Sequence, residues 1–286
     1  MSTPALKLES NAPDAGLVFS WAGGKSRILP KLVSRLPDDI HKRRYIEPCM
    51  GSGALFFWLR PERAILSDAN NKLMVAYHAI KRYPTRVLQV VESHERLHRE
   101  DPKLYYAAVR EAFNDQDSNK LDWEFAGDLI YLNCACFNGL YRENRNGEFN
   151  VPIGSSLKGR ISESERVLAA GRALQKADLL SGSCVEVAMR HADADSFVYF
   201  DPPYHGGFTQ YTARGFTEDD QLQLARCVDE LSGRGVKVML SNSDTPLMRE
   251  FYERPQYRVE TIQAPRAVNS NGAGRQAVSE LLVTNY

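Results

Sequence analysis

The sequence predicts an α/β protein whose mostly parallel sheet is interrupted by a mainly helical insertion. Two stretches, 17–83 and 177–286, alternate short apolar segments with helix-like segments, as parallel strands joined by helices do. Between them, residues 84–176 show the spacing of helices. We therefore predict a sheet-forming domain from 17–83 and 177–286, a helical domain at 84–176 inserted into it, and a loose polar tail at 1–16.

The first stretch is expected to hold three strand–helix units. A short strand at 17–20, a glycine turn and a helix starting near Ser26 are expected in LVFSWAGGKSRILPKL. A strand, a glycine-rich loop and a helix are expected in RRYIEPCMGSGALFFWL. A strand, a turn and a helix follow in RAILSDANNKLMVAYHAIKRYP.

The inserted stretch and the return to the sheet are read in the same way. Helical spacing marks VLQVVESHERL, KLYYAAVREAF and FAGDLIYLNCACF, and a polar loop follows at 138–160. Strand–helix alternation resumes with ADLLSGSCVEVAM, the strand FVYF, the helix TEDDQLQLARCVDELSGRG and the strand VKVMLSN. The last two candidate strands, YRVETIQA and VSELLVTNY, suit an antiparallel pair.

Composition indicates an ordinary water-soluble protein. Hydrophobic residues make up 43% and charged residues 25%, and 36 basic side chains balance 36 acidic ones. A nucleic-acid surface would therefore have to be a local patch. The five cysteines lack the paired spacing of a zinc site, and no apolar run suits a signal peptide or a membrane span. We expect reduced thiols and a cytoplasmic protein.

Two glycine-rich loops invite comparison with phosphate-binding motifs, and both comparisons fail. AGGKS could end a P-loop, but the first glycine of that motif would fall on Phe19. GSG at 51–53 could begin a dinucleotide fingerprint, but its third glycine would fall on Phe56.

The loop at 51–53 still has a context that suggests a ligand. It follows a predicted strand, and Asp68 lies 17 residues after Gly51, near where an acid holds ribose hydroxyls in such sheets. Glycines also let a ligand approach the backbone closely. A nucleoside site without a pyrophosphate and a plain turn with a helix-capping Asp both fit these residues.

A second candidate site follows the buried-looking strand FVYF. There the chain continues with Asp201, Pro202, Pro203 and Tyr204. Ligands of open α/β sheets bind outside the carboxyl ends of strands. Because proline lacks an N–H, the carbonyls of Asp201 and Pro202 are expected to stay available as acceptors. A carboxylate, carbonyls and an aromatic face suit a flat ligand with an exocyclic amino group. A proline-rich turn is the structural alternative.

The chain carries, in order, the motifs SWAGGKS, IEPCMGSGALFF, ILSDAN, NGLYRENRNGEFNVPIG, DPPY, FTQYTARGFT, SNSDT and VNSNGAGRQAVSELL. With these it resembles the Dam-type (D12 class, group α) DNA adenine-N6 methyltransferases of bacteria and phages over nearly its whole length. The resemblance implies a Rossmann-like class I methyltransferase sheet with a DNA-recognition insertion. It also implies S-adenosylmethionine as methyl donor and a flipped-out adenine in double-stranded DNA as acceptor. DPPY rather than SPPW favours adenine N6 over cytosine N4.

The resemblance implies a role for individual residues. Asp201 and the Pro202 carbonyl would accept hydrogens from N6, and Tyr204 would stack on the base. The catalytic motif would comprise Asp201, Pro202, Pro203 and Tyr204. The cofactor would be surrounded by Trp21, Lys25, Glu47, Gly51, Gly53, Asp68 and Phe208. No metal is needed for this chemistry.

The polar loop at 138–160, called the recognition segment below, is the expected DNA contact. It carries four basic and two acidic residues, a local charge of +2. By the resemblance, Arg142 reads a guanine of GATC and Asn138 helps to fill the space left by the flipped base. Leu140 and Asn144 match further contact positions.

Two positions depart from the pattern of the GATC-specific members. Ser20 stands where they carry a guanine-reading lysine, and Ser155 stands where many carry an arginine. A lost base contact relaxes specificity by about 1–3 kcal/mol per bidentate pair. We expect a GATC-like or a shorter, relaxed recognition sequence.

Other functions stay open at this point. A methyltransferase acting on RNA adenine or on cytosine N4 would share the motifs. A non-catalytic relative that only binds DNA is the second alternative, and the intact Asp201 and Tyr204 speak against it. No obligate protein partner is predicted.

Overall fold

The computed structural model describes residues 17–115, 121–155, 164–206, 215–264 and 278–286. Phe208, predicted beside the cofactor, lies outside these ranges. Seven strands of the described chain form one sheet in the order β3-β2-β1-β4-β5-β7-β6. Their bounds are β1 Arg44–Glu47, β2 Ala64–Asp68, β3 Ala177–Ser181, β4 Ser196–Phe200, β5 Lys237–Ser243, β6 Arg258–Ala264 and β7 Val278–Thr284.

The first five strands are parallel, and β7 is antiparallel to both β5 and β6. The predicted α/β class and the predicted antiparallel pair at the end of the chain are therefore confirmed. The chain moves outward from β1 to β2 and β3, then returns to place β4 on the other side of β1. Such a reversal of strand order opens a crevice at the carboxyl ends of the two central strands.

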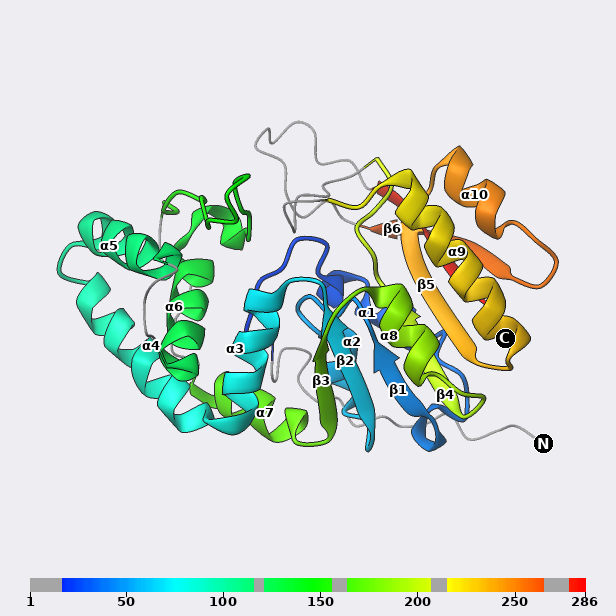
Figure 1. Cartoon of the computed structure of the whole chain (residues 1–286), viewed down its shortest axis with the longest axis horizontal. Coiled ribbons are helices and arrows are strands. Elements are labelled where there is room, and N and C mark those ends of the chain that lie inside the picture. The colour runs from blue at the N-terminus through cyan, green and yellow to red at the C-terminus, as the bar shows by residue number, and fades with distance from the viewer. Residues whose placement is uncertain (1–16, 116–120, 156–163, 207–214, 265–277) are drawn as a thin grey trace.

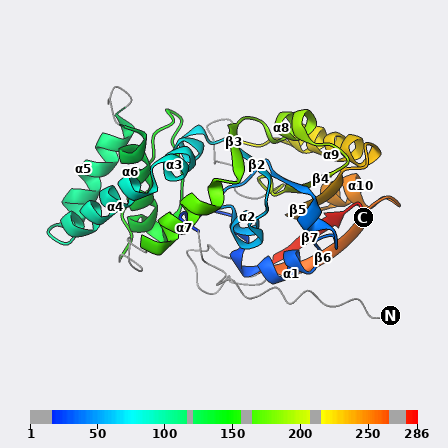
Figure 2. The same cartoon turned by 90° about the horizontal axis from the view of Figure 1, so that it is seen from below.

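Helices cover both faces of the sheet (Figures 1 and 2). One face packs against α1 (Leu29–Val33), α2 (Ala54–Leu59) and α3 (Asn71–Arg82). The other packs against α8 (Cys184–His191), α9 (Glu218–Gly233) and α10 (Pro246–Tyr252). Strand residues alternate between the two cores, because successive side chains point to opposite faces.

Four further helices lie beyond α3 at one side of the sheet (Figure 1). They are α4 (Pro84–His98), α5 (Pro102–Asn114), α6 (Asp122–Ala135) and α7 (Ser164–Leu174). The helix α3 packs against α6 and α7 as well as against β2 and β3. The helical character predicted for 84–176 is borne out, whereas the division into two domains at these residues stays a prediction. No helix in the described ranges has the length and apolar character to cross a bilayer.

Of the elements predicted at 17–35, the glycine turn is present, the strand is wrong and the helix is shorter than expected. Residues 17–20 form no strand, because Asn133 rather than a neighbouring strand bonds the backbone N–H and C=O of Ser20. The helix expected from Ser26 is split into a 3₁₀ turn, Lys25–Arg27, and the short α1. Pro30 sits in the first turn of α1, where its missing N–H does no harm.

Candidate active site

The predicted site residues meet at the carboxyl ends of the central strands. The glycine loop follows β1, Asp68 ends β2, and Asp201 follows β4. Lys25 reaches the same edge from the N-terminal 3₁₀ turn. Parallel strands end at one edge, so segments far apart in the sequence come together here.

The glycine loop has a backbone that only glycine adopts without strain. Gly51 has φ +47° and Gly53 has φ +67°. A Cβ on Gly51 would lie 2.9 Å from Cδ1 of Trp21. The Trp21 indole therefore packs directly against Gly51, and a side chain at position 51 would collide with it.

Asp68 ties this loop to the next strand. Its Oδ2 accepts a hydrogen bond from the Gly51 N–H at 2.9 Å, and its Oδ1 accepts one from the Asn70 N–H at 2.9 Å. Burial raises the pKa of Asp68, and these backbone donors oppose the rise. The Ala69 backbone also bonds to this carboxylate, which has about four lone-pair positions, so acceptor capacity remains for a ligand hydroxyl.

Asp201 lies in a network of donors. Its Oδ1 is 2.7 Å from Nζ of Lys25 and accepts a hydrogen bond from Oγ of Ser241 at 3.1 Å. The hydroxyls of Tyr199 and Ser241 are 2.9 Å apart, which continues the network into the sheet. Burial raises the pKa of Asp201, while the Lys25 ammonium opposes the rise and favours the carboxylate.

The two proline carbonyls differ in their partners among the described residues. The carbonyl of Pro203 accepts a hydrogen bond from Nε2 of Gln221 at 2.8 Å. Within the part of the chain that the structure describes, no donor bonds to the carbonyl of the buried Pro202. Two acceptors, an Asp201 oxygen and this carbonyl, thus stand side by side in the chain.

Tyr204 presents its ring to the same space. Nζ of Lys25 lies 4.7 Å from the ring centre, and the phenol donates a hydrogen bond to Oε2 of Glu280 at 2.8 Å. An N–H donor bound to Asp201 above an aromatic ring is the arrangement expected for an amino-bearing flat ligand. Here the ammonium of Lys25 takes that position.

Glu47 is the most deeply buried acid of the site, with 2% of its surface exposed. Burial raises its pKa to about 8, although the Tyr45 hydroxyl donates to its Oε2 at 2.9 Å. Trp21 stacks on Tyr141 of the recognition segment, with ring centres 4.8 Å apart. This contact joins the predicted cofactor residues to the predicted DNA contacts.

The recognition segment begins where the chain turns sharply after α6. Asn138 is exposed and has φ +56°, and Leu140 is partly buried. A Cβ on Gly139, between them, would lie 2.8 Å from Cβ of Ser20. The predicted contacts Ser20, Asn138 and Leu140 are therefore neighbours, although 118 residues separate the first two.

The remaining predicted DNA contacts, Arg142 and Asn144, differ in exposure and in how many hydrogen bonds they make within the segment. Arg142 is exposed and bonds through Nε to Oδ1 of Asn150 at 2.8 Å. Asn144 instead uses its amide within its own turn, accepting from the Asn146 and Glu148 N–H groups and donating to the Glu148 carboxylate. Arg142 can thus reach outward, whereas Asn144 shapes the turn.

Three supporting residues were missed by sequence reasoning: Ser241, Asn133 and Glu280. Asn133 is fully buried and joins Ser20 to the recognition segment. Glu280 has a recognisable signal, since it is the one charged residue in the apolar run VSELLV. Ser241 opens the motif SNSDT, although no role was predicted for it. Asn133 has no such signal, because only the fold brings it to Ser20.

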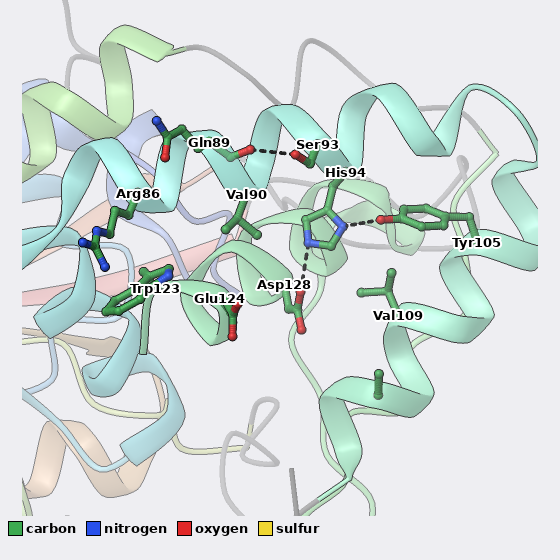
Figure 3. Close-up of a pocket in the computed structure, with 11 residues that line it drawn as sticks. Arg86, Gln89, Val90, Ser93, His94, Tyr105, Val109, Trp123, Glu124 and Asp128 are labelled. Atoms are coloured by element: carbon green, nitrogen blue, oxygen red, sulfur yellow. Dashed lines mark hydrogen bonds and ion pairs between the residues drawn. The ribbon is translucent and has the colours of Figure 1, made fainter. Parts of the chain in front are cut away.

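The described residues contain no group of three or more His, Cys, Asp or Glu side chains that could hold a metal ion. A separate cavity of about 720 Å³ lies among α4, α5 and α6 (Figure 3). In it His94 bridges the Tyr105 hydroxyl at 2.8 Å and Oδ1 of Asp128 at 2.9 Å. This chain of bonds holds the three helices together.

Comparison with known proteins shows which family the chain is similar to. The family model described as D12 class N6 adenine-specific DNA methyltransferase matches residues 21–268. The type II methyltransferase M1.LlaDCHI of Lactococcus lactis subsp. cremoris is 35% identical over 287 residues, which cover 98% of each chain. The DNA adenine methylase of Vibrio cholerae serotype O1 is 36% identical over 92% of this chain and 94% of its own. The DNA N-6-adenine-methyltransferase of Escherichia phage P1 is 32% identical over 93% of this chain and 35% of its own.

Proposed function

Because the chain belongs to the D12 class of N6 adenine-specific DNA methyltransferases, we propose that Asp201, Pro202 and Tyr204 receive the target adenine and direct methyl transfer to its N6. The observation that carries the proposal is the Lys25 ammonium, 2.7 Å from Asp201 and 4.7 Å from the Tyr204 ring centre. It marks a position that accepts N–H donors beside an aromatic face, which is what an adenine amino group requires. Pro203 completes the rigid motif.

The residues of the glycine loop fit S-adenosylmethionine as methyl donor. The test is the loop itself: two glycines at positive φ let a ligand approach its backbone, and the Asp68 carboxylate beside it retains acceptor capacity for a ribose hydroxyl. Trp21, Lys25, Glu47 and Gly53 line the same edge, and Phe208 belongs to the proposed set by sequence alone. When bound, this cofactor supplies an electrophilic methyl group on a sulfonium.

The work of the chain's own residues follows from their geometry. An adenine inside a duplex must be flipped out to reach Asp201. One N6 hydrogen would bond to Asp201 and the other to the Pro202 carbonyl, drawing N6 from planar towards tetrahedral and exposing its lone pair. Holding N6 in line with the methyl group supplies much of the rate. The Asp201 carboxylate then stabilises the cationic N6 or takes its proton.

The recognition segment is proposed to read DNA through Arg142, with Asn138 and Leu140 near the space left by the flipped base. Ser20 belongs to this surface because it lies against Gly139. Asn144 would support the segment by shaping its turn. With serine rather than lysine at position 20, we propose a relaxed or shortened relative of GATC as the recognition sequence.

The test uses tritium-methyl S-adenosylmethionine and two duplexes, one with a single GATC and one with adenines but no GATC. Label in both duplexes supports adenine methylation with relaxed choice, and label only in the first sinks the relaxed-specificity idea. Ser20→Lys is then expected to shift labelling towards the GATC duplex. Label in neither duplex, with Asp201→Ala equally silent, would refute adenine methylation of duplex DNA.

The setting of the reaction is part of the same proposal. Double-stranded DNA is the proposed partner, no obligate protein partner is needed, and the bacterial cytoplasm or nucleoid is the proposed location. The relatives include type II methyltransferases and a phage enzyme. A purified monomer that labels DNA without additions would support this setting.

A further inference from the structure

Glu280 reaches the catalytic edge because its strand runs against the others. The strand β7 is antiparallel to β5, so its first residues lie beside the carboxyl end of β5. Glu280 pairs in register with Ser243, while Leu282 pairs with Ser241, whose hydroxyl bonds to Asp201. If β7 were parallel to β5, its last residues rather than its first would lie at this edge, and Glu280 would be at the opposite edge.

The side chain of Glu280 has a defined partner in the catalytic motif. The Tyr204 hydroxyl donates to its Oε2 at 2.8 Å. Hydrogen bonds to a charged acceptor are stronger than neutral ones, and both residues of this pair are half-buried. The opposite constraint comes from Lys25, whose ammonium lies over the ring at 4.7 Å from its centre. The ring is thus held at its tip by Glu280 and over its face by Lys25.

Lys25 cannot keep this position when a base arrives. The ammonium occupies the Asp201 oxygen and the ring face that the proposed function gives to adenine. Once it moves, the hydroxyl bond to Glu280 still restrains the ring, beside the weaker interaction of the Tyr204 hydroxyl with Ser241. An aromatic platform must be held parallel to the base if N6 is to meet Asp201.

We propose that Glu280 is a positioning residue for the target base: its carboxylate fixes the plane of the Tyr204 ring, and it acts only through the Tyr204 hydroxyl. This inference rests on the proposed function. It assigns the antiparallel strand β7 a part in base orientation, and it separates Glu280 from the residues that touch the reacting atoms.

The test is a double-mutant cycle on the full chain, with Glu280→Ala, Glu280→Gln, Tyr204→Phe and the two combined variants. Single-turnover methyl transfer to an adenine duplex reports the step after binding, and S-adenosylmethionine affinity and thermal unfolding are measured beside it. Glu260→Ala is the matched control, because Glu260 lies on the adjacent strand β6 and pairs with Arg35 instead.

We expect Glu280→Ala and Tyr204→Phe each to slow transfer about tenfold, as the loss of one charge-assisted hydrogen bond predicts. Glu280→Gln keeps an acceptor for the hydroxyl and is expected within about threefold of the wild type. Adding either Glu280 change to Tyr204→Phe should cost nothing more. Cofactor affinity and the Glu260→Ala control should match the wild type.

Additive losses in the combined variants would overturn the inference, because Glu280 would then act by another route. Equal losses in Glu280→Gln and Glu280→Ala would do the same, since charge rather than the bond would matter. If Glu280→Ala does not fold, the Gln and Phe variants still decide. A wild-type protein that labels no duplex refutes the proposed function, and this inference with it.

Discussion

Asn133 offers the sharpest test of how the two sides of the site are joined. Its Oδ1 accepts from the Ser20 N–H at 2.8 Å, and its Nδ2 donates to the carbonyls of Ser20 at 2.9 Å and Gly139 at 3.2 Å. The side chain is fully buried. Asn133→Ala would therefore remove three hydrogen bonds at once and leave a backbone donor and two acceptors without this partner.

The expected cost follows from that count. Each buried polar group left unsatisfied costs about 1–3 kcal/mol, and some relaxation or water entry lowers the sum. We expect a loss of about 3–5 kcal/mol in the free energy of unfolding, a large share of the 5–15 kcal/mol typical of a folded protein. Asn133→Asp keeps the acceptor but buries a carboxylate against two carbonyl oxygens, so its loss of unfolding free energy should be at least as large as that of Asn133→Ala.

Urea unfolding followed by circular dichroism measures this loss. Asn146→Ala is the control, because Asn146 is exposed in the same recognition segment. DNA affinity should fall together with the unfolding free energy. Asn133 joins Ser20 to Gly139, and both residues belong to the proposed DNA contact surface. A loss below about 1 kcal/mol would refute the reasoning, because the three bonds would then contribute no more than one average hydrogen bond.

Three further predictions concern the site itself. Asp201→Asn should slow methyl transfer by about 10²–10⁴-fold while cofactor binding, measured by equilibrium dialysis, stays near the wild type. Gly51→Ala should weaken cofactor binding about tenfold, because its Cβ would meet Trp21 and a left-handed backbone costs about 1–2 kcal/mol; unchanged affinity would contradict the glycine loop as the cofactor site. Glu47, with its pKa raised from 4.5 to about 8, stabilises the fold fully below pH 4.5 and loses that contribution as pH rises through 8. Glu47→Gln should therefore gain in unfolding free energy relative to the wild type between pH 5 and about 8, and a constant difference would exclude the shift.

The sequence predicted the site where local motifs sit at strand ends. Gly51, Asp68 and Asp201 each follow an apolar strand, and parallel strands bring such positions to one edge. The order of the motifs and the helical spacing of 84–176 were enough for the architecture. The terminal antiparallel pair was predictable because the two candidate strands follow one another along the sequence.

What escaped prediction depends on contacts between distant segments. Residues 17–20 look like a strand, but Asn133 takes the bonds that a strand would make. Lys25 reads as a cofactor residue, yet its ammonium lies on Asp201 and over Tyr204. Glu280 joins the site only because β7 runs antiparallel. The spacing of residues along the sequence does not predict these contacts between distant residues.

The position of β7 also has a consequence for the order of events during synthesis. This strand follows every other described strand in the sequence, yet it lies between β5 and β6 in the sheet. Until it emerges from the ribosome, β5 has an open edge and β6 has no partner in the sheet. Unpaired edges invite association with other chains. A nascent chain therefore has its glycine loop, residues 51–53, long before it has Glu280, and the antiparallel side of the sheet forms only after β7 emerges.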